Sequence, residues 1–231
     1  MKKLLFVVAA VAMLSCNSVK KESTVMVEES LIETPEQAIA ALEDGNMRFM
    51  NNKSLEIHDE IEYVKSLASG QAPFACVICC SDSRVPAELL FNQGFGDLFV
   101  VRTAGNTVLD NFTLGSVEYA ATHLGVKAIV VLGHTSCGAI TAIIDKEAHG
   151  DHSDHGHGDM VETPLGEMLG VIEHLLPKGT ELSVDDAIMA NIAIQVETIM
   201  SEEGVAKMVA DGDLVVVPAI YDIATGEVTF M

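Results

Sequence analysis

Basic residues, cysteine and tryptophan are scarce or absent in this sequence. Lys and Arg number 13 against 34 Asp and Glu, which gives a formal net charge of −21. The chain therefore lacks the basic face that binds nucleic acid phosphates or docks on anionic lipid. Five cysteines among 231 residues are too few for a disulfide scaffold. The hydrophobic fraction of 49% excludes a disordered chain, and the length suits one domain or two small ones.

No apolar run is long enough to span a membrane. The apolar run at the N-terminus has the pattern of an export signal. Lys2 and Lys3 precede an apolar run over 4–14, which is too short to span a bilayer as a helix. Ser15 and Cys16 follow this run directly. That order resembles the lipobox of bacterial lipoproteins, which implies lipidation of Cys16.

The sequence thus predicts three segments. Residues 1–16 are a lipoprotein-type signal peptide, residues 17–33 are a flexible tether, and residues 34–231 are the folded domain. Cleavage after residues 10–12 is the alternative, and it would release a soluble periplasmic protein. In either case we expect a protein of the bacterial cell envelope. A lipid anchor on Cys16 would be its only contact with a membrane.

Within 34–231, short apolar runs alternate with helical patterns. Strands are predicted at 74–80, 97–102, 128–132, 214–221 and 227–230. Helices are predicted at 34–50, 114–124, 164–176 and 184–203. This alternation predicts an α/β fold with a mainly parallel sheet of four or five strands, flanked by helices. Pro218 indicates a local break in the fourth strand, and the His-rich segment 149–159 must be a loop.

Residues that bind soft metals follow two of the predicted strands. Cys80 ends the first strand, and His134 and Cys137 follow the third. Because the carboxyl ends of parallel strands meet at one edge of a sheet, these side chains can converge there. Two thiolates and one imidazole suit tetrahedral Zn²⁺, and three protein ligands leave the fourth position open, as in catalytic zinc sites. The competing interpretation is that each cysteine is only a small buried hydrophobic residue.

Charged residues next to the first cysteine favour the catalytic interpretation. Asp82 and Arg84 lie two and four residues after Cys80. Arg84 and Arg102 both stand at strand ends near the predicted site, where a planar guanidinium can fork to a carboxylate.

Together these motifs resemble the β-class carbonic anhydrases. The resemblance runs from about Thr34 to Phe230 and includes Gly45, Asn46, Arg48 and Phe49, the run 97–102 with Ala104-Gly105-Asn106, Glu118-Tyr119-Ala120, Ala190-Asn191, and Tyr221-Asp222 with Thr225-Gly226. It implies reversible hydration of carbon dioxide to bicarbonate and a proton, with one Zn²⁺ per chain. Cys80, His134 and Cys137 would be the zinc ligands, and Asp82 with Arg84 the catalytic dyad. In the family, the aspartate can also ligate zinc when its arginine pair breaks.

The resemblance also implies a substrate pocket and an oligomer. Gln71 matches the glutamine that contacts substrate, and Phe99 and Tyr119 match an aromatic wall contributed across a dimer interface. We therefore expect a homodimer or a tetramer.

Two other functions fit the same residues. The site could hydrolyse COS or CS₂, in which sulfur replaces one or both oxygen atoms of carbon dioxide. Access to the pocket would decide between these substrates. A zinc-storage lipoprotein is the second alternative. The His-rich loop favours storage slightly, whereas the acid and base at Asp82 and Arg84 argue against it, because storage needs no dyad.

Overall fold

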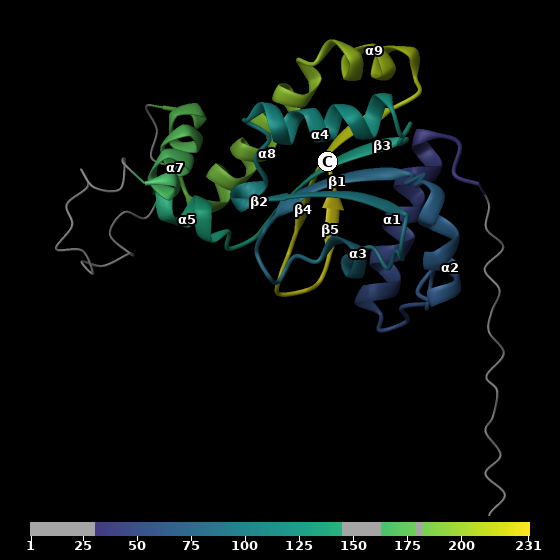
Figure 1. Cartoon of the computed structure of the whole chain (residues 1–231). Coiled ribbons are helices and arrows are strands. Elements are labelled where there is room, and N and C mark those ends of the chain that lie inside the picture. Colours follow the sequence, from purple (N-terminus) through teal and green to yellow (C-terminus); the bar gives the residue numbers. More distant parts are fainter. Residues whose placement is uncertain (1–30, 145–162, 179–181) are drawn as a thin grey trace, which may run out of the picture. The chain divides into compact units, whose positions relative to one another are not determined.

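A five-stranded sheet with the order β2-β1-β3-β4-β5 forms the centre of the fold (Figure 1). The strands are β1 (Ala75–Cys80), β2 (Leu98–Thr103), β3 (Ala128–His134), β4 (Val215–Tyr221) and β5 (Val228–Phe230). The first four strands run parallel, and β5 pairs with β4 in the antiparallel direction. The expected α/β fold with a mainly parallel sheet is confirmed.

The computed structural model describes residues 31–144, 163–178 and 182–231. The predicted signal peptide 1–16, nearly all of the tether 17–33 and the His-rich loop 149–159 lie outside these residues. Residues 32–231 form one unit by their internal contacts. In the described part of the chain, no helix combines the length and the apolar content needed to cross a membrane.

Two of the described helices precede the first strand, and the others lie in the connections between β1 and β4. The helices are α1 (Pro35–Met50), α2 (Ile61–Ser66), α3 (Ala87–Leu90), α4 (Asn111–Thr122), α5 (Gly138–Ile144), α7 (Pro164–Leu175), α8 (Val184–Met200) and α9 (Glu203–Asp211), with short 3₁₀ turns η1 (Leu67–Ser69) and η2 (Ala104–Asn106). The helices expected from sequence correspond to α1, α4, α7 and α8. The structure ends α8 at Met200 and starts α9 as a separate helix, where the sequence predicted one helix over 184–203.

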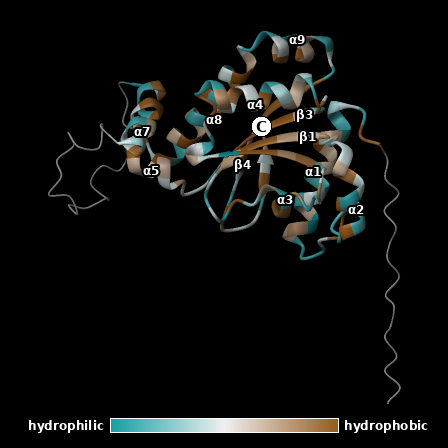
Figure 2. Ribbon diagram, in the orientation of Figure 1, coloured by the Kyte–Doolittle hydropathy of each residue, from teal (hydrophilic) through white to brown (hydrophobic). Residues whose placement is uncertain are grey.

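The sheet separates two hydrophobic cores. Alternate residues of β1 point to opposite faces, so Cys76 belongs to one core and Cys79 to the other. Helices α4, α8 and α9 cover the first face, and α1 and α3 cover the second (Figure 1). The strands are hydrophobic along their length, whereas the helices carry one hydrophilic side (Figure 2). Both cysteines are therefore core residues.

Helix α8 lies close to the carboxyl end of β3 because two local features place it there. The Ser183 hydroxyl caps the helix by accepting from the Asp186 N–H at 3.1 Å. Further along, a Cβ at Gly133 would lie 2.4 Å from Ile192 Cδ1, so any larger residue there would force the Ile192 side chain to move. Gly133 directly precedes His134, and this contact brings α8 beside the predicted site.

The break predicted at Pro218 does not occur. The pairing of β3 with β4 continues through Pro218, which lies opposite Val131. The Pro218 carbonyl accepts from the Met231 N–H at 3.0 Å, on the side of the strand that faces β5. Because the nitrogen and the carbonyl of one strand residue point to the same side, the missing N–H of Pro218 removes no hydrogen bond to β3.

Candidate active site

Three metal-binding side chains converge at the carboxyl end of the sheet. Cys80 is the last residue of β1, His134 is the last residue of β3, and these strands are parallel neighbours. Cys137 directly precedes α5. The sulfur atoms of the two cysteines and a ring nitrogen of His134 all lie within 4.8 Å of one another, and the three residues are buried. The order of the strands thus brings together residues that are more than fifty positions apart in the sequence.

One ring nitrogen of His134 lies within hydrogen-bond distance of a carbonyl, and the other has no hydrogen-bond partner among the described residues. His134 Nδ1 lies 3.0 Å from the Thr135 carbonyl. A carbonyl only accepts, so Nδ1 carries the proton and Nε2 presents a lone pair. Among the described residues, His134 Nε2 and Asn106 Nδ2 are the buried side-chain nitrogen or oxygen atoms without a hydrogen-bond partner. A lone pair that is buried and unpartnered, beside two sulfur atoms, fits a metal ligand.

The two thiols influence each other strongly. A hydrogen bond from Cys137 lowers the pKa of the Cys80 thiol, and the Gly105 N–H also donates to Cys80 Sγ, at 3.4 Å. The same pairing with Cys80, together with burial, raises the pKa of the Cys137 thiol. The pair therefore retains one proton near neutral pH in the absence of metal. A divalent cation that binds both sulfur atoms would displace this proton. The donor set and its protonation thus fit Zn²⁺.

Asp82 and Arg84 form a two-pronged ion pair in the segment that follows Cys80. Arg84 Nε donates to Asp82 Oδ1 at 2.9 Å, and Arg84 Nη2 donates to Asp82 Oδ2 at 2.7 Å. These side-chain hydrogen bonds hold the pKa of the Asp82 carboxyl well below its usual range. Arg84 Nη2 also donates to the Ser136 carbonyl at 3.2 Å. One arginine therefore connects the motif after β1 with the motif after β3.

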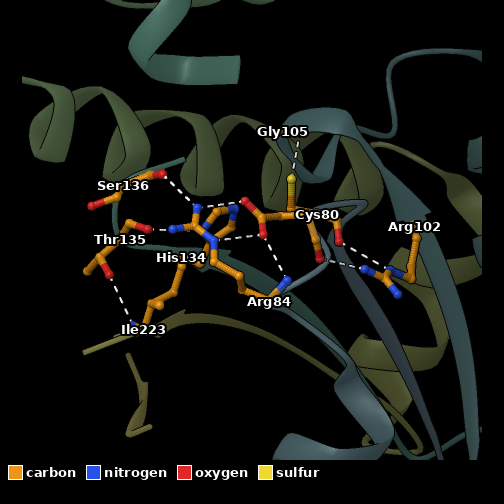
Figure 3. A network of polar contacts seen from close by, with 9 residues as sticks. Cys80, Arg84, Arg102, Gly105, His134, Thr135, Ser136 and Ile223 are labelled. Atoms are coloured by element: carbon orange, nitrogen blue, oxygen red, sulfur yellow. Dashed lines mark hydrogen bonds and ion pairs between the residues drawn. The ribbon is translucent and has the colours of Figure 1, made fainter. Parts of the chain in front are cut away.

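Arg102 has a different role from the one expected. Among the residues that the structure describes, no carboxylate pairs with Arg102, and it binds two backbone carbonyls instead (Figure 3). Its Nε donates to the Cys80 carbonyl at 3.2 Å, and its Nη2 donates to the Asp82 carbonyl at 2.7 Å. Arg102 thus holds the backbone that presents both a metal-binding sulfur and the acidic side chain. Sequence patterns give no signal for this role, because every residue offers a carbonyl.

The expected pocket residues do not join the site of their own chain. Phe99 pairs with Cys76 in the sheet, four residues before Cys80 on β1, which is roughly 13 Å along a strand. Tyr119 lies on α4, with its ring centroid 6.3 Å from that of Phe99. Gln71 is exposed in the segment that leads into β1. These residues lie toward the amino end of the parallel strands, whereas the metal-binding group lies at the carboxyl end.

Comparison with known proteins gives consistent matches across the domain. A sequence profile of the family described as carbonic anhydrase matches residues 75–228. A carbonic anhydrase from Mycolicibacterium smegmatis is 40% identical over 201 residues, which cover 84% of this chain and 92% of that protein. Carbonic anhydrase 2 of Mycobacterium tuberculosis is 37% identical over 199 residues, with 83% and 90% of the two chains covered.

Solved structures agree with the sequence matches. One of two tetrameric beta-carbonic anhydrases from the filamentous ascomycete Sordaria macrospora superposes with a TM-score of 0.61 and 25% sequence identity. The match covers 81% of this chain and 93% of that chain. The sheet and its surrounding helices are therefore similar to those of a solved beta-carbonic anhydrase.

Proposed function

The chain belongs to the β-class carbonic anhydrases, and we propose that Cys80, His134 and Cys137 hold its zinc ion while Asp82 and Arg84 form the catalytic pair. Enzymes of this family use zinc to interconvert carbon dioxide and bicarbonate, and this chain is a carbonic anhydrase by the same comparisons. The observation that carries the residue assignment is the convergence of three buried ligand atoms within 4.8 Å. COS or CS₂ hydrolysis and zinc storage have no comparable support.

Zinc bound by this group would have two sulfur ligands and one nitrogen ligand from the protein. When bound, Zn²⁺ acts as a Lewis acid that lowers the pKa of a water molecule to about 7. The protein supplies a buried site with three ligands, which leaves the fourth position on the metal for water, and it fixes the direction of two of these ligands. The Thr135 carbonyl fixes the His134 ring, and Arg102 fixes the backbone of Cys80.

Asp82 would orient the nucleophile for the attack on carbon dioxide. Arg84 donates to Asp82 Oδ1 from both its backbone N–H and Nε, and to Oδ2 from Nη2, which leaves a lone pair of Oδ2 to accept a hydrogen bond from the reacting hydroxyl group. The lowered pKa of Asp82 keeps this carboxylate ionised at neutral pH. Asp82 thus accepts a hydrogen bond and directs the oxygen lone pair toward the substrate.

Stopped-flow measurement of carbon dioxide hydration, with a pH indicator and with zinc content determined on the same sample, tests this assignment. We expect fast turnover at about one zinc per chain. Bound zinc without turnover at any pH from neutral to alkaline would contradict the proposed catalytic pair.

We also propose that two chains share each substrate pocket. Gln71, Phe99 and Tyr119 lie at the opposite end of the strands from the metal-binding group of their own chain. In a symmetric dimer they could line the metal site of the partner, because such interfaces place the same surfaces in reciprocal contact. The exposed ring of Tyr119 supports this arrangement, since it is 44% exposed in the single chain.

A mixing experiment tests the shared pocket. The double variant Gln71→Ala/Tyr119→Ala removes two exposed pocket residues, and Cys137→Ala removes one metal ligand of the other chain. Each variant alone should be nearly inactive. When equal amounts are dissociated and reassociated, half of the dimers are mixed and each mixed dimer has one intact site. We therefore expect roughly a quarter of wild-type hydration activity to return.

The opposite result is equally clear. If the pocket residues acted only within their own chain, no mixed dimer would contain an intact site. Activity would then stay at the level of the separate variants, and the shared pocket would be excluded. Size-exclusion chromatography of each variant provides the control for assembly.

For the cell, we propose an exported enzyme anchored in the bacterial envelope by lipid on Cys16. The support is the sequence alone: two lysines, an apolar run over 4–14, and a cysteine directly after it. More than one acyl chain on this residue would give a stable anchor, whereas a single chain would not. The periplasm is the expected compartment.

Metabolic labelling in a bacterial host tests the anchor. Wild-type protein should incorporate labelled palmitate and sediment with membranes, and Cys16→Ser should lose the label and become soluble in the periplasm. An unlabelled wild-type protein cleaved after residue 12 would establish the soluble alternative.

A further inference from the structure

A chain of buried hydrogen bonds leads from α8 to one of the metal-binding sulfur atoms. The Gln195 Oε1 atom accepts from the Val108 N–H at 2.9 Å, and Gln195 Nε2 donates to Asn191 Oδ1 at 3.0 Å. Asn191 Nδ2 in turn donates to the Gly105 carbonyl at 2.8 Å. The Gly105 N–H then donates to Cys80 Sγ at 3.4 Å. The two amide side chains thus hold the turn that carries the donor to the sulfur.

This arrangement is unusual for a core helix. Asn191 is 1% exposed and Gln195 is 0% exposed. All other buried residues of α8 are apolar. They stand four residues apart, so their side chains meet on one helix face. Burying two amides stabilises a fold only when their polar atoms are satisfied. Here each amide bonds the backbone segment 105–108, so this segment has one fixed position.

The backbone conformation of Gly105 favours glycine at this position. Its φ of +70° lies in the left-handed region, which glycine adopts without a steric penalty. The Cβ of any other residue would lie 3.4 Å from Ile172 Cδ1 and 3.5 Å from Ala139 Cβ. Side chains of α5 and α7 thus lie beside Gly105, and the two amides of α8 bond its turn.

We propose that Asn191 and Gln195 are positioning residues for the zinc site, an inference that rests on Cys80 being a zinc ligand. By fixing the turn 105–108, they keep the Gly105 N–H on the Cys80 sulfur. A hydrogen bond to a metal-bound thiolate withdraws charge from the sulfur and fixes its direction. The two amides thereby control how much negative charge Cys80 gives to the metal and how firmly the metal is held. Neither amide touches the substrate.

The test compares variants of α8 by two properties of the metal site other than activity. Gln195→Met removes both hydrogen bonds of the amide and preserves most of its volume; Asn191→Ala removes the bond to the Gly105 carbonyl. The control is Ile199→Ala, because Ile199 is also 0% exposed on α8 but makes none of these bonds.

The first measurement is the rate at which zinc leaves the full protein for a coloured chelator. The second is the sulfur-to-metal charge-transfer band after Co²⁺ replaces zinc. We expect at least about tenfold faster zinc release in Gln195→Met and Asn191→Ala, with a shifted band. Ile199→Ala should lower the melting temperature but leave both properties as in the wild type.

Two results would overturn the proposal. Unchanged release and spectrum in both amide variants would show that the turn holds without them. Equal changes in Ile199→Ala would show a general loosening of the core. A wild-type protein without any sulfur-to-cobalt band would instead remove Cys80 as a ligand, so a failure of the proposed metal site is distinguished from a failure of the amide positioning.

Discussion

Replacing Cys137 with alanine should reduce both the zinc content and the carbon dioxide hydration rate of this chain to near background. The substitution leaves only Cys80 and His134 to hold the metal. Loss of a direct ligand costs more than loss of a supporting residue, for which a reduction of 10–100-fold is usual. We therefore expect less than about 1% of the wild-type rate at limiting zinc.

The physical reason lies in the pairing of the two thiols. Cys137 is buried and shares a proton with Cys80, so it becomes a second thiolate only when a cation compensates the charge. Alanine offers no donor atom. The remaining sulfur and nitrogen would bind zinc through only two protein ligands, and such a site loses metal readily to a chelator.

Cys79→Ala is the matched control. Cys79 is adjacent to Cys80 in β1 but faces the other core, where burial raises the pKa of its thiol to about 12. Its replacement should lower the melting temperature slightly and leave zinc content and turnover within about twofold of the wild type. Full zinc content in Cys137→Ala, measured with stopped-flow turnover on the same sample, would contradict the ligand assignment.

The sequence made the metal-binding group predictable because its residues stand at strand ends. The apolar runs of β1 and β3 end at Cys80 and His134, and a parallel sheet brings such ends to one edge. The apolar runs predict only that the two ends can lie side by side; that β1 and β3 are neighbours is seen in the structure. Strand order depends on packing over the whole sheet, which no local pattern encodes.

The elements that escaped prediction are short or depend on distant contacts. Helices α2 and α3 span only six and four residues, which is too short to show a helical period. The end of α8 at Met200 depends on how α9 packs against α4, so the apolar pattern alone runs through it. Arg102 binds backbone carbonyls, for which no sequence signal exists.

The two amides of α8 are visible in the sequence as polar residues on an apolar helix face. Asn191 and Gln195 stand four residues apart within an otherwise apolar face, and polar residues at such positions must find partners inside the core. The sequence could thus have indicated a buried polar contact on α8. It could not have indicated the turn 105–108 as the partner, because that contact joins segments more than eighty residues apart.

Replacing Asp82 with asparagine should lower the hydration rate by about 10²–10³-fold and leave the zinc content unchanged. Asparagine preserves the size of the side chain but not its charge. One arm of the Arg84 fork would then face an amide N–H group, so the pair would open. Asp82 does not belong to the converging group of Cys80, His134 and Cys137, so metal binding should survive.

Asp211→Asn supplies the control for the loss of a carboxylate. Asp211 forms an ion pair with Lys207 on the exposed surface of α9. Such exposed pairs contribute little to stability, so this variant should keep wild-type turnover. A comparable fall in both variants would mean that net charge, and not the position of Asp82, affects the rate.

The dependence on pH separates two roles of Asp82. Hydrogen bonds from Arg84 hold its pKa below the ordinary value, so the carboxylate is ionised throughout the neutral range and its stabilising interactions are lost only when acid lowers the pH toward that depressed pKa. If Asp82 acts by orienting the nucleophile, Asp82→Asn should lower the rate by a similar factor from about pH 6 to about pH 9. If Asp82 instead left Arg84 to ligate zinc at lower pH, the variant would lose less activity at about pH 6 than at about pH 9. Stopped-flow rates across this range, with Asp211→Asn as the control, distinguish the two roles. A smaller loss at the acid end would contradict a purely orienting role.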